Sequence, residues 1–240
     1  MDRAWAAALV HLAASEACCT PHERQRQRRA NVGSMTERGR FSGSAMLVTG
    51  AGHGIGRACA ARLAAEGARV AVTDLDLNAA REVVAGLPDG AGPHLALLID
   101  VTERSSVEKA VAQVADDFGG LDGVVNVAGG DLPHGVFEEI SDEIWLQLLE
   151  LNLVGVARVC RASIPSLRRS KRSPAIVTVS SINAHVALGS EPYSSAKAGL
   201  TALTRNLAAY LAADGVRVNA VAPGTIRTRV WDGRRAESNG

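Results

Sequence analysis

The sequence predicts an α/β fold in which a doubly wound parallel sheet is covered by helices on both faces. Short apolar segments alternate along the chain with longer segments of helical spacing, as expected for strands joined by crossover helices. The apolar segments are continuous rather than alternating, as in strands buried on both faces. The first of them, residues 45–49, runs directly into a glycine-rich turn and a helix. We therefore expect six parallel strands.

Each predicted strand is a short apolar run that stops at a glycine or a polar residue. The run over 45–49 stops at Gly50, and the run over 69–74 stops at Asp74. Runs of this length, bounded by turn residues, are typical of buried strands. The expected strands span residues 45–49, 69–74, 94–99, 123–127, 175–180 and 216–221.

The predicted helices carry apolar residues at helical spacing. Between 107 and 118 the apolar positions recur at i, i+3, i+4, i+7, i+8 and i+11, which forms one apolar stripe. Gly67, Gly86 and Gly119 follow three of the helices, as is common where helices end, and Asp76 is suited to cap an N-terminus. The expected helices span residues 55–66, 77–85, 107–118, 141–170 and 192–213.

Composition excludes several classes of protein. The chain has 240 residues, of which 47% are hydrophobic and 3% aromatic, and its net charge is +1. A near-neutral chain with so few aromatic side chains argues against binding to nucleic acid or to a membrane. The four cysteines fit neither a disulfide framework nor a metal-binding spacing, so we expect a reduced, cytoplasmic protein without a metal site. No apolar run approaches the roughly 20 residues that cross a bilayer.

The first 43 residues differ from the rest of the chain. Residues 1–40 carry seven arginines against four acidic residues, and His11 interrupts their apolar stretch. A disordered leader, or a start assigned upstream of Met35, is the simpler interpretation, and a transit peptide or a basic nucleic-acid-binding arm is the alternative. We predict a leader over residues 1–43 and one Rossmann-type domain over residues 44–240.

The turn after the first strand predicts a nucleotide site. Glycines allow the backbone to turn tightly and to approach a pyrophosphate, which then lies at the exposed N–H groups of a helix N-terminus. A plain tight turn is the alternative, but the position between the first strand and the first helix favours nucleotide binding. The candidate residues are Gly50, Gly52, His53, Gly54, Ile55 and Gly56.

Asp74 predicts the choice of cofactor. It ends the second strand 18 residues after Gly56, close to the spacing at which an acidic residue hydrogen-bonds the ribose hydroxyls of a dinucleotide. A carboxylate there repels a 2′-phosphate, and neither Thr73 nor Leu75 supplies an arginine to bind one. We therefore expect NAD rather than NADP.

Tyr193 and Lys197 predict acid–base chemistry. The chain holds only two tyrosines and three lysines, and this pair is spaced i and i+4, on one face of a helix. A cation near a phenol favours the phenolate, so we expect Lys197 to lower the pKa of Tyr193 and to make it a general base. A solvated surface pair is the alternative.

Together these motifs resemble the short-chain dehydrogenase/reductase family. The resemblance runs in family order from residue 45 to 228, and such a set of motifs is specific. The matching segments are Thr49 to Gly56, Asp74, Asp100-Val101, Asn126 to Gly129, Asn152 to Gly155, Ser180-Ser181, Tyr193 to Lys197 and Pro223-Gly224.

The resemblance implies roles for these residues. Tyr193 would be the acid/base, Lys197 would bind the nicotinamide ribose and tune Tyr193, and Ser181 would hold the substrate oxygen. Asn152 would anchor a water in the proton relay. The implied cofactor-binding residues are Gly50, Gly52, His53, Gly54, Ile55, Gly56, Asp74, Asp100, Val101, Asn126, Ala128, Gly129, Tyr193, Lys197, Pro223, Gly224, Ile226 and Thr228.

The sequence departs from the family pattern at two places. Val127 replaces an asparagine, which is a mild change. Ser181 precedes Tyr193 by 12 residues where the family commonly has 13, and Ser180 has the commoner spacing. We prefer Ser181 because it follows the strand as the family's catalytic serine does, and we expect Ser180 to point into the sheet.

Five further side chains could line the substrate pocket: three lie in the loop before Tyr193, which shapes the pocket in family members, and two follow the fourth strand at its mouth. For these residues a solvated loop is an equally good interpretation. They are Asp131, His134, His185, Ser190 and Glu191.

The resemblance implies an oxidoreductase that transfers a hydride between NAD(H) and a secondary alcohol or ketone. A small-molecule substrate and a homo-oligomer, dimeric or tetrameric, are expected with it. The family normally continues for several tens of residues after Pro223-Gly224 with a substrate-covering segment and a seventh strand, for which the apolar residues are lacking here. The alternative is therefore a truncated, catalytically inactive NAD-binding module. An NAD-using epimerase of the extended relatives fits the glycine spacing less well.

Overall fold

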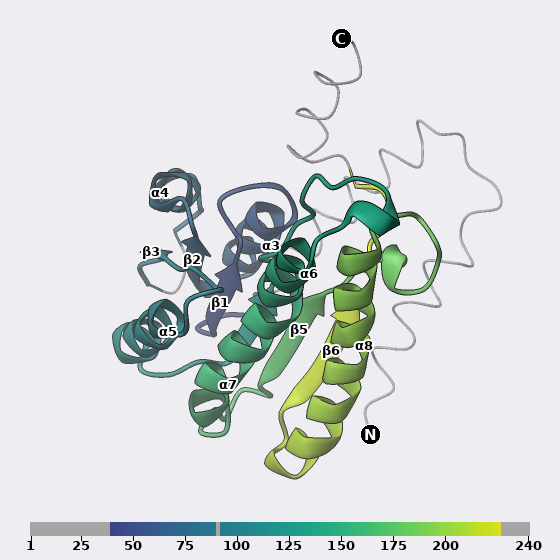
Figure 1. The fold of residues 1–240 in the computed structure, drawn as a ribbon. Coiled ribbons are helices and arrows are strands. Elements are labelled where there is room, and N and C mark those ends of the chain that lie inside the picture. The colour runs from purple at the N-terminus through teal and green to yellow at the C-terminus, as the bar shows by residue number, and fades with distance from the viewer. Residues whose placement is uncertain (1–38, 90–91, 227–240) are drawn as a thin grey trace, which may run out of the picture. The chain divides into compact units, whose positions relative to one another are not determined.

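The computed structural model describes residues 39–89 and 92–226, which belong to the second of the two units of the chain, Arg40–Gly240, apart from Gly39. Most of the predicted leader, and the segment in which a seventh strand was not expected, lie outside the described residues. The described part holds a single sheet with the strand order β3-β2-β1-β4-β5-β6, in which every pairing is parallel (Figure 1). The predicted doubly wound α/β fold is confirmed.

The strands agree closely with the apolar runs in the sequence. All of them are short, and the third, fourth, fifth and sixth are trimmed by one or two residues relative to the prediction. Their bounds are β1 Ala45–Thr49, β2 Arg69–Asp74, β3 Leu95–Leu98, β4 Gly123–Asn126, β5 Ala175–Val179 and β6 Arg217–Val221.

The helices connect the strands and agree with the expected order. The predicted N-cap at Asp76 is confirmed, because its carboxylate accepts hydrogen bonds from the backbone N–H groups of Asn78 and Ala79 at 2.9 and 3.2 Å. The α-helices are α3 Gly54–Ala65, α4 Leu77–Ala85, α5 Arg104–Phe118, α6 Asp142–Leu149, α7 Gly155–Leu167 and α8 Glu191–Leu211. Short 3-10 turns lie at η1 Phe137–Glu139, η3 Ile182–Ala184 and η4 Ala212–Asp214.

The long helix predicted over 141–170 is divided. A π-helical turn, η2 Glu150–Val154, lies between α6 and α7, so the two helices are continuous but out of phase. A π turn is one residue wider than an α-helical turn, and such turns are frequent at functional sites. The apolar spacing in the sequence does not reveal it.

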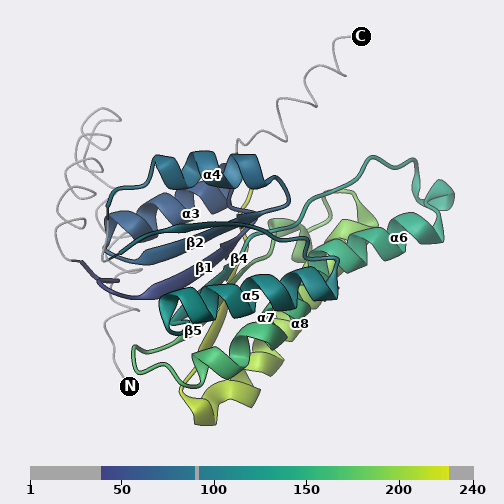
Figure 2. The same ribbon diagram turned by 90° about the vertical axis from the view of Figure 1, so that its left-hand side faces the viewer.

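Two layers of helices enclose the sheet, with α3 and α4 on one face and α5, α7 and α8 on the other (Figure 2). Successive side chains of β1 alternate between the two cores: Met46 and Val48 pack with α3 and α4, and Leu47 packs with α5 and α7. Each central strand therefore needs apolar residues at consecutive positions, which explains the continuous runs.

The pairing of β1 with β2 and β4 determines where a ligand site is expected in this sheet. Thr49 pairs with Thr73 of β2 on one side and with Asn126 of β4 on the other. The connections leave β1 and β4 in opposite directions, and in sheets of this kind ligands bind outside the carboxyl ends of the strands at that point.

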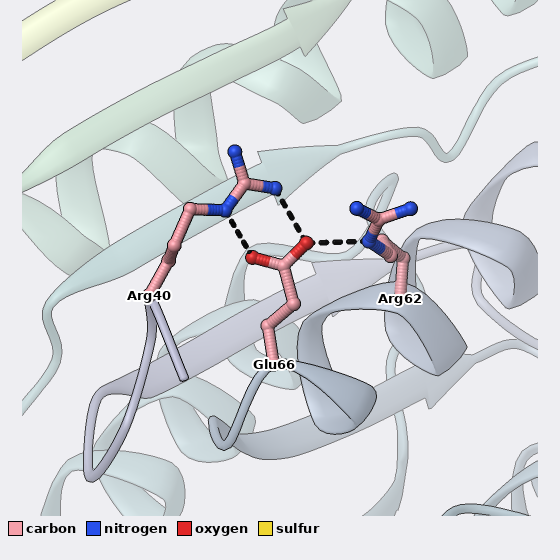
Figure 3. A network of polar contacts seen from close by, with 3 residues as sticks. All are labelled: Arg40, Arg62 and Glu66. Carbon is pink, nitrogen blue, oxygen red and sulfur yellow. Dashed lines mark hydrogen bonds and ion pairs between the residues drawn. The ribbon is translucent and has the colours of Figure 1, made fainter. Parts of the chain in front are cut away.

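A buried acidic residue fastens the segment before β1 to the end of α3 (Figure 3). The side chain of Glu66 is fully buried, and it accepts two hydrogen bonds from Arg40 and one from Arg62, each at 2.5 Å. The bond from Arg40 holds the pKa of Glu66 below its ordinary value, against the opposing effect of burial, and Arg62 contributes in the same direction. The N–H of Phe41 also donates to the carbonyl of Glu66 at 3.0 Å.

We predict that Glu66→Gln lowers the free energy of unfolding by about 2 kcal/mol at neutral pH, because a neutral amide replaces the buried carboxylate that pairs with Arg40 and Arg62. Since the pKa of the folded-state carboxyl is lowered, its contribution is present above the unfolded-state pKa of about 4.3 and is lost as the pH falls through the folded-state value. Urea unfolding between pH 7 and pH 3 should show this dependence in the unchanged protein and a flatter profile in the variant.

Glu108→Gln is the matched control. Glu108 pairs with Arg104 at 2.7 Å, but both side chains are exposed, so the expected change is under about 0.5 kcal/mol. Equal destabilisation by the two substitutions would contradict a special role for the buried carboxylate.

Candidate functional site

A cleft of about 720 Å³ opens at the carboxyl ends of the strands. Residues that follow or end all six strands line it, so the winding of the sheet alone brings distant parts of the chain together. Fifteen of the residues predicted from the sequence lie in its wall: Gly50, His53, Gly54, Ile55, Asp74, Asp100, Val101, Ala128, Gly129, Ser181, Tyr193, Lys197, Pro223, Gly224 and Ile226.

The glycine turn brings the N-terminus of α3 to the cleft. Gly50 has a φ of +61°, and a Cβ there would lie 2.8 Å from the backbone N of Ala128. A Cβ on Gly56 would lie 2.2 Å from the carbonyl oxygen of Gly50, so the helix can approach the strand only without a side chain at that position. Gly52 and Gly56 do not line the cleft themselves but permit this packing.

The N-terminus of α3 fits an anionic group. No side chain caps it, and its first turn carries no acidic residue, while Gly54 and Ile55 of that turn line the cleft. Unpaired N–H groups at a helix N-terminus favour a phosphate. The turn could therefore hold the pyrophosphate of a dinucleotide.

Asp74 lies beside this turn at the end of β2. Its Oδ2 accepts the N–H of Gly52 at 2.8 Å, and its Oδ1 accepts the N–H of Asp76 at 3.1 Å. The two bonds orient a carboxylate that lines the cleft next to Leu75. A ribose hydroxyl could donate to it, because a carboxylate has lone pairs for about four donors.

Asp100 and Val101 form the next part of the wall. The Asp100 carboxylate accepts the N–H and the hydroxyl of Thr102 at 2.9 and 2.6 Å, which fixes the turn after β3. Val101 is buried, and a Cβ on Gly155 would lie 2.9 Å from its side chain. The turn thus rests directly on α7.

Tyr193 and Lys197 meet in the cleft from one face of α8. The Lys197 side chain is almost fully buried, and its Nζ donates to the carbonyl of Val179 at 3.0 Å and lies 5.5 Å from the centre of the Tyr193 ring. Burial lowers the pKa of Lys197 to about 8.

The pKa of Tyr193 moves in the direction opposite to the one expected. Burial raises it, a hydrogen bond with Ser181 lowers it, and the charge of Asp131 raises it further. The expectation considered only the attraction of the Lys197 charge. In the structure the ammonium donates to the Val179 carbonyl, and the phenol is protonated at neutral pH.

The two candidate serines have different partners. Ser181 lines the cleft together with Tyr193, and its hydroxyl donates to the side-chain oxygen of Asn183 at 3.1 Å. Ser180 donates to the backbone carbonyl of Lys197 at 2.9 Å, which ties the end of β5 to α8. Both serines line the cleft, and Ser181 is the one that affects the pKa of Tyr193.

Asn152 lies behind the cleft, in the π turn between α6 and α7. Its side chain is fully buried; the Oδ1 accepts the N–H of Gly130 at 3.0 Å, and the Nδ2 donates to the carbonyls of Gly130 and Leu148 at 2.8 and 3.0 Å. It holds the loop after β4 in place and does not line the cleft.

Asn126 also lies away from the cleft wall. It is the buried last residue of β4; its Nδ2 donates to the Cys160 sulfur at 3.4 Å, and its Oδ1 has no hydrogen-bond partner among the described residues. The segment it begins does reach the cleft, through Val127 and Ala128. Thr228, the remaining predicted residue, lies outside the described residues.

Sequence reasoning missed several residues of the wall. Leu151, Ile182 and Leu188 are apolar residues without a motif, and no signal in the sequence separates them from core residues. Asn183 and Thr225 lie after β5 and β6, within two residues of the predicted site residues Ser181 and Gly224, and that position could have indicated them. All of them line the cleft.

No group of three or more histidine, cysteine, aspartate or glutamate side chains suited to a metal ion is found within 39–89 and 92–226. No helix in this part of the chain is both long enough and apolar enough to cross a membrane.

We predict that Gly129→Ala destabilises the protein by about 2–4 kcal/mol, since Gly129 has a φ of +154° and a Cβ would lie 2.6 Å from the Asn152 Oδ1 and 3.3 Å from the Lys197 Nζ. Thermal unfolding measures the effect. The control is Gly130→Ala, where a Cβ meets nothing within 4 Å and the change should be under about 1 kcal/mol. Similar losses in both variants would show that the contact with Asn152 is unimportant.

Comparisons with known proteins agree with this arrangement. The sequence model of the family described as short chain dehydrogenase matches residues 44–239. L-fucose dehydrogenase of Bos taurus is 36% identical over 194 residues, which cover 80% of this chain and 70% of the relative. The 3-oxoacyl-acyl-carrier-protein reductase of Escherichia coli is 37% identical over 190 residues, which cover 78% and 75%.

A solved structure shows the same fold. The crystal structure of a dehydrogenase/reductase from Sinorhizobium meliloti 1021 has a TM-score of 0.76 and 32% sequence identity, and the match covers 86% of this chain and 82% of that one. The chain belongs to the short-chain dehydrogenase family.

Proposed function

We propose that the protein is an NAD-dependent oxidoreductase that interconverts a secondary alcohol and a ketone. The observation that carries the proposal is the convergence of Ser181, Tyr193 and Lys197 in the cleft that also holds the glycine turn. When bound, NAD would accept a hydride from the alcohol, and NADH would return one to the ketone.

Each side chain would contribute a separate step. Ser181 would hold the substrate oxygen by a hydrogen bond, and Tyr193 would exchange a proton with that oxygen at its phenolic group. The raised pKa of Tyr193 leaves the phenol protonated at neutral pH, which is the form that donates to a ketone. Lys197 would bind the ribose next to the nicotinamide and tune Tyr193, and Asn152, which holds the loop after β4, would anchor a water in the proton relay.

The names of the relatives support this class of reaction in both directions. One is a dehydrogenase of a sugar, L-fucose, and the other is a reductase of a 3-oxoacyl group. We therefore propose that the substrate of this chain is a small alcohol or ketone. A cytoplasmic location and a homo-oligomer, in which α6, α7 and α8 form the contacts common in the family, belong to the same proposal.

Asp74 supports NAD over NADP. Its carboxylate, fixed by the N–H groups of Gly52 and Asp76, faces the cleft where a 2′-phosphate would bring a second negative charge. Like charges in contact cost several kcal/mol.

We predict that Tyr193→Phe lowers the turnover of secondary alcohols at least about a hundredfold, because the proton exchange is lost. The affinity of this variant for NADH, measured by titration of NADH fluorescence, should differ from that of the unchanged protein by no more than about twofold. Tyr210→Phe is the control, since Tyr210 is 65% exposed on α8 and does not line the cleft. Retained turnover in Tyr193→Phe would contradict the proposal, and NADH binding without any turnover in the unchanged chain would favour an NAD-binding module.

Replacement of Asp74 tests the choice of cofactor. Asp74→Asn should lower the ratio of kcat/KM for NAD to that for NADP by about tenfold or more, because the repulsion of the 2′-phosphate is removed. Asp76→Asn should leave the ratio unchanged, since Asp76 caps α4 and asparagine caps equally well. An unchanged ratio in Asp74→Asn would exclude this carboxylate as the determinant.

A further inference from the structure

A partly buried ion pair lies behind the wall of the cleft at the turn after β3. Arg158 of α7 pairs through its Nη2 with the carboxylate of Glu150 in η2, and the side chain of Arg158 is 18% exposed. The other terminal nitrogen of Arg158, Nη1, donates to the backbone carbonyl of Val101 at 3.4 Å. The chemistry described above uses neither Arg158 nor Glu150.

We propose that Arg158 is a positioning residue for the cofactor, because it holds the turn after β3 in the conformation that recognises the adenine base. Glu150 acts through Arg158 by orienting the guanidinium. This inference rests on the proposed function, and specifically on NAD as its cofactor. It adds a residue that does not itself line the cleft.

The order of the strands indicates where the adenine base would lie. Tyr193 and Lys197, beside which the nicotinamide would react, belong to α8, which packs against β6 at one end of the strand order. The glycine turn follows β1 in the middle of the sheet, and Asp74 ends β2. A dinucleotide with its pyrophosphate at the glycine turn and a ribose at Asp74 would therefore extend to the carboxyl end of β3. Asp100 and Val101 line the cleft there.

The carboxylate of Asp100 suits the exocyclic amino group of adenine. An ionised carboxylate only accepts hydrogen bonds, and the amino group donates them. Both bonds from Thr102 go to the Asp100 Oδ1, at 2.9 and 2.6 Å, so the Oδ2 can accept an N–H of the base. Hypoxanthine carries a carbonyl oxygen in place of the amino group and would bring an acceptor against the carboxylate. A correctly placed turn should therefore distinguish the two bases.

The turn after β3 is held by two helices, α5 and α7, which lie side by side on one face of the sheet (Figure 2). From α5, the Ser106 hydroxyl accepts the N–H of Asp100 at 2.9 Å. From α7, Gly155 permits a close approach, because a Cβ there would lie 2.9 Å from the Val101 side chain and 3.1 Å from its carbonyl oxygen. Arg158, three residues further along α7, donates to the same carbonyl. The Val101 carbonyl is thus the point at which α7 determines the position of the turn.

The ion pair makes this contact specific for arginine. A guanidinium presents its N–H groups in a fixed planar fork, so one terminal nitrogen binds the Glu150 carboxylate while the other binds the Val101 carbonyl. The single ammonium of a lysine cannot take both places. Loss of the guanidinium would release the turn from α7, whereas the Asp74 carboxylate keeps its own bonds to backbone N–H groups. The effect should therefore be confined to recognition of the base.

The test compares the affinities of the full chain for NADH and for reduced nicotinamide hypoxanthine dinucleotide, which differ only in the base. Titration of dihydronicotinamide fluorescence measures both. We expect the unchanged protein to bind NADH about tenfold more tightly, and Arg158→Met to reduce this preference about fivefold. Arg161→Met, which removes an exposed arginine of the same helix, should leave the preference unchanged.

A second substitution tests the part played by the ion pair. Glu150→Gln should reduce the preference less than Arg158→Met, and the double variant should be no worse than Arg158→Met alone, because Glu150 acts through the guanidinium. Circular dichroism confirms that each variant is folded. If Arg158→Met does not fold, a reduced preference in Arg158→Lys supports the inference, and an unchanged preference overturns it. If neither variant of Arg158 folds, Glu150→Gln decides in the same way.

The outcomes separate this inference from the proposed function. An unchanged preference in folded Arg158→Met, or equal binding of the two dinucleotides by the unchanged protein, overturns the role of Arg158 and leaves the oxidoreductase intact. Equal loss of affinity for both dinucleotides in Arg158→Met would show a merely structural role and would also overturn it. NADH binding with the expected preference but without turnover of any alcohol would overturn the proposed reaction and support the inference. Absence of NADH binding would overturn both.

Discussion

The close approach of the carboxyl ends of β1 and β4 is the constraint on which the rest of the site depends. The Thr49 hydroxyl accepts the N–H groups of Val127 and Ala128 at 3.2 and 3.3 Å, and Gly50 lies against Ala128 with no room for a side chain. This contact turns the chain after each strand away from its neighbour. The N-terminus of α3 and the loop after β4 then form opposite sides of the cleft, and a bulkier residue at Gly50 would separate them.

Buried polar groups hold the residues that line the cleft. Asn152 satisfies both backbone groups of Gly130, Ser180 binds the backbone of Lys197, and the Val179 carbonyl fixes the lysine ammonium. Each of these polar groups is buried, and each has a partner, so their burial does not carry the full cost of unsatisfied hydrogen bonds. Tyr193 and Lys197 are therefore carried by a helix that is bonded to the end of β5.

The fold and most of the cleft wall could be predicted from the sequence. The parts that could not be predicted depend on packing between segments that are distant in the chain. Continuous apolar runs and glycine stops are local signals, so the strands and the glycine turn could be predicted. The π turn around Asn152 leaves no trace in apolar spacing, and the lining by Leu151 and Leu188 depends on tertiary packing. The direction of the Tyr193 pKa depends on burial and on Asp131, which is 62 residues away in the chain.

The contact between Arg40 and Glu66 has a consequence for where the folded domain begins. The predicted boundary was the first strand, yet the arginine that neutralises the buried carboxylate stands five residues before Ala45. Shortened versions of the chain that start at β1 would keep every strand of the sheet but lose Arg40. Arg62 alone would then pair with the buried carboxylate of Glu66. Arg40 therefore belongs with the domain that holds Glu66, and deletion variants intended for crystallisation or expression should retain it.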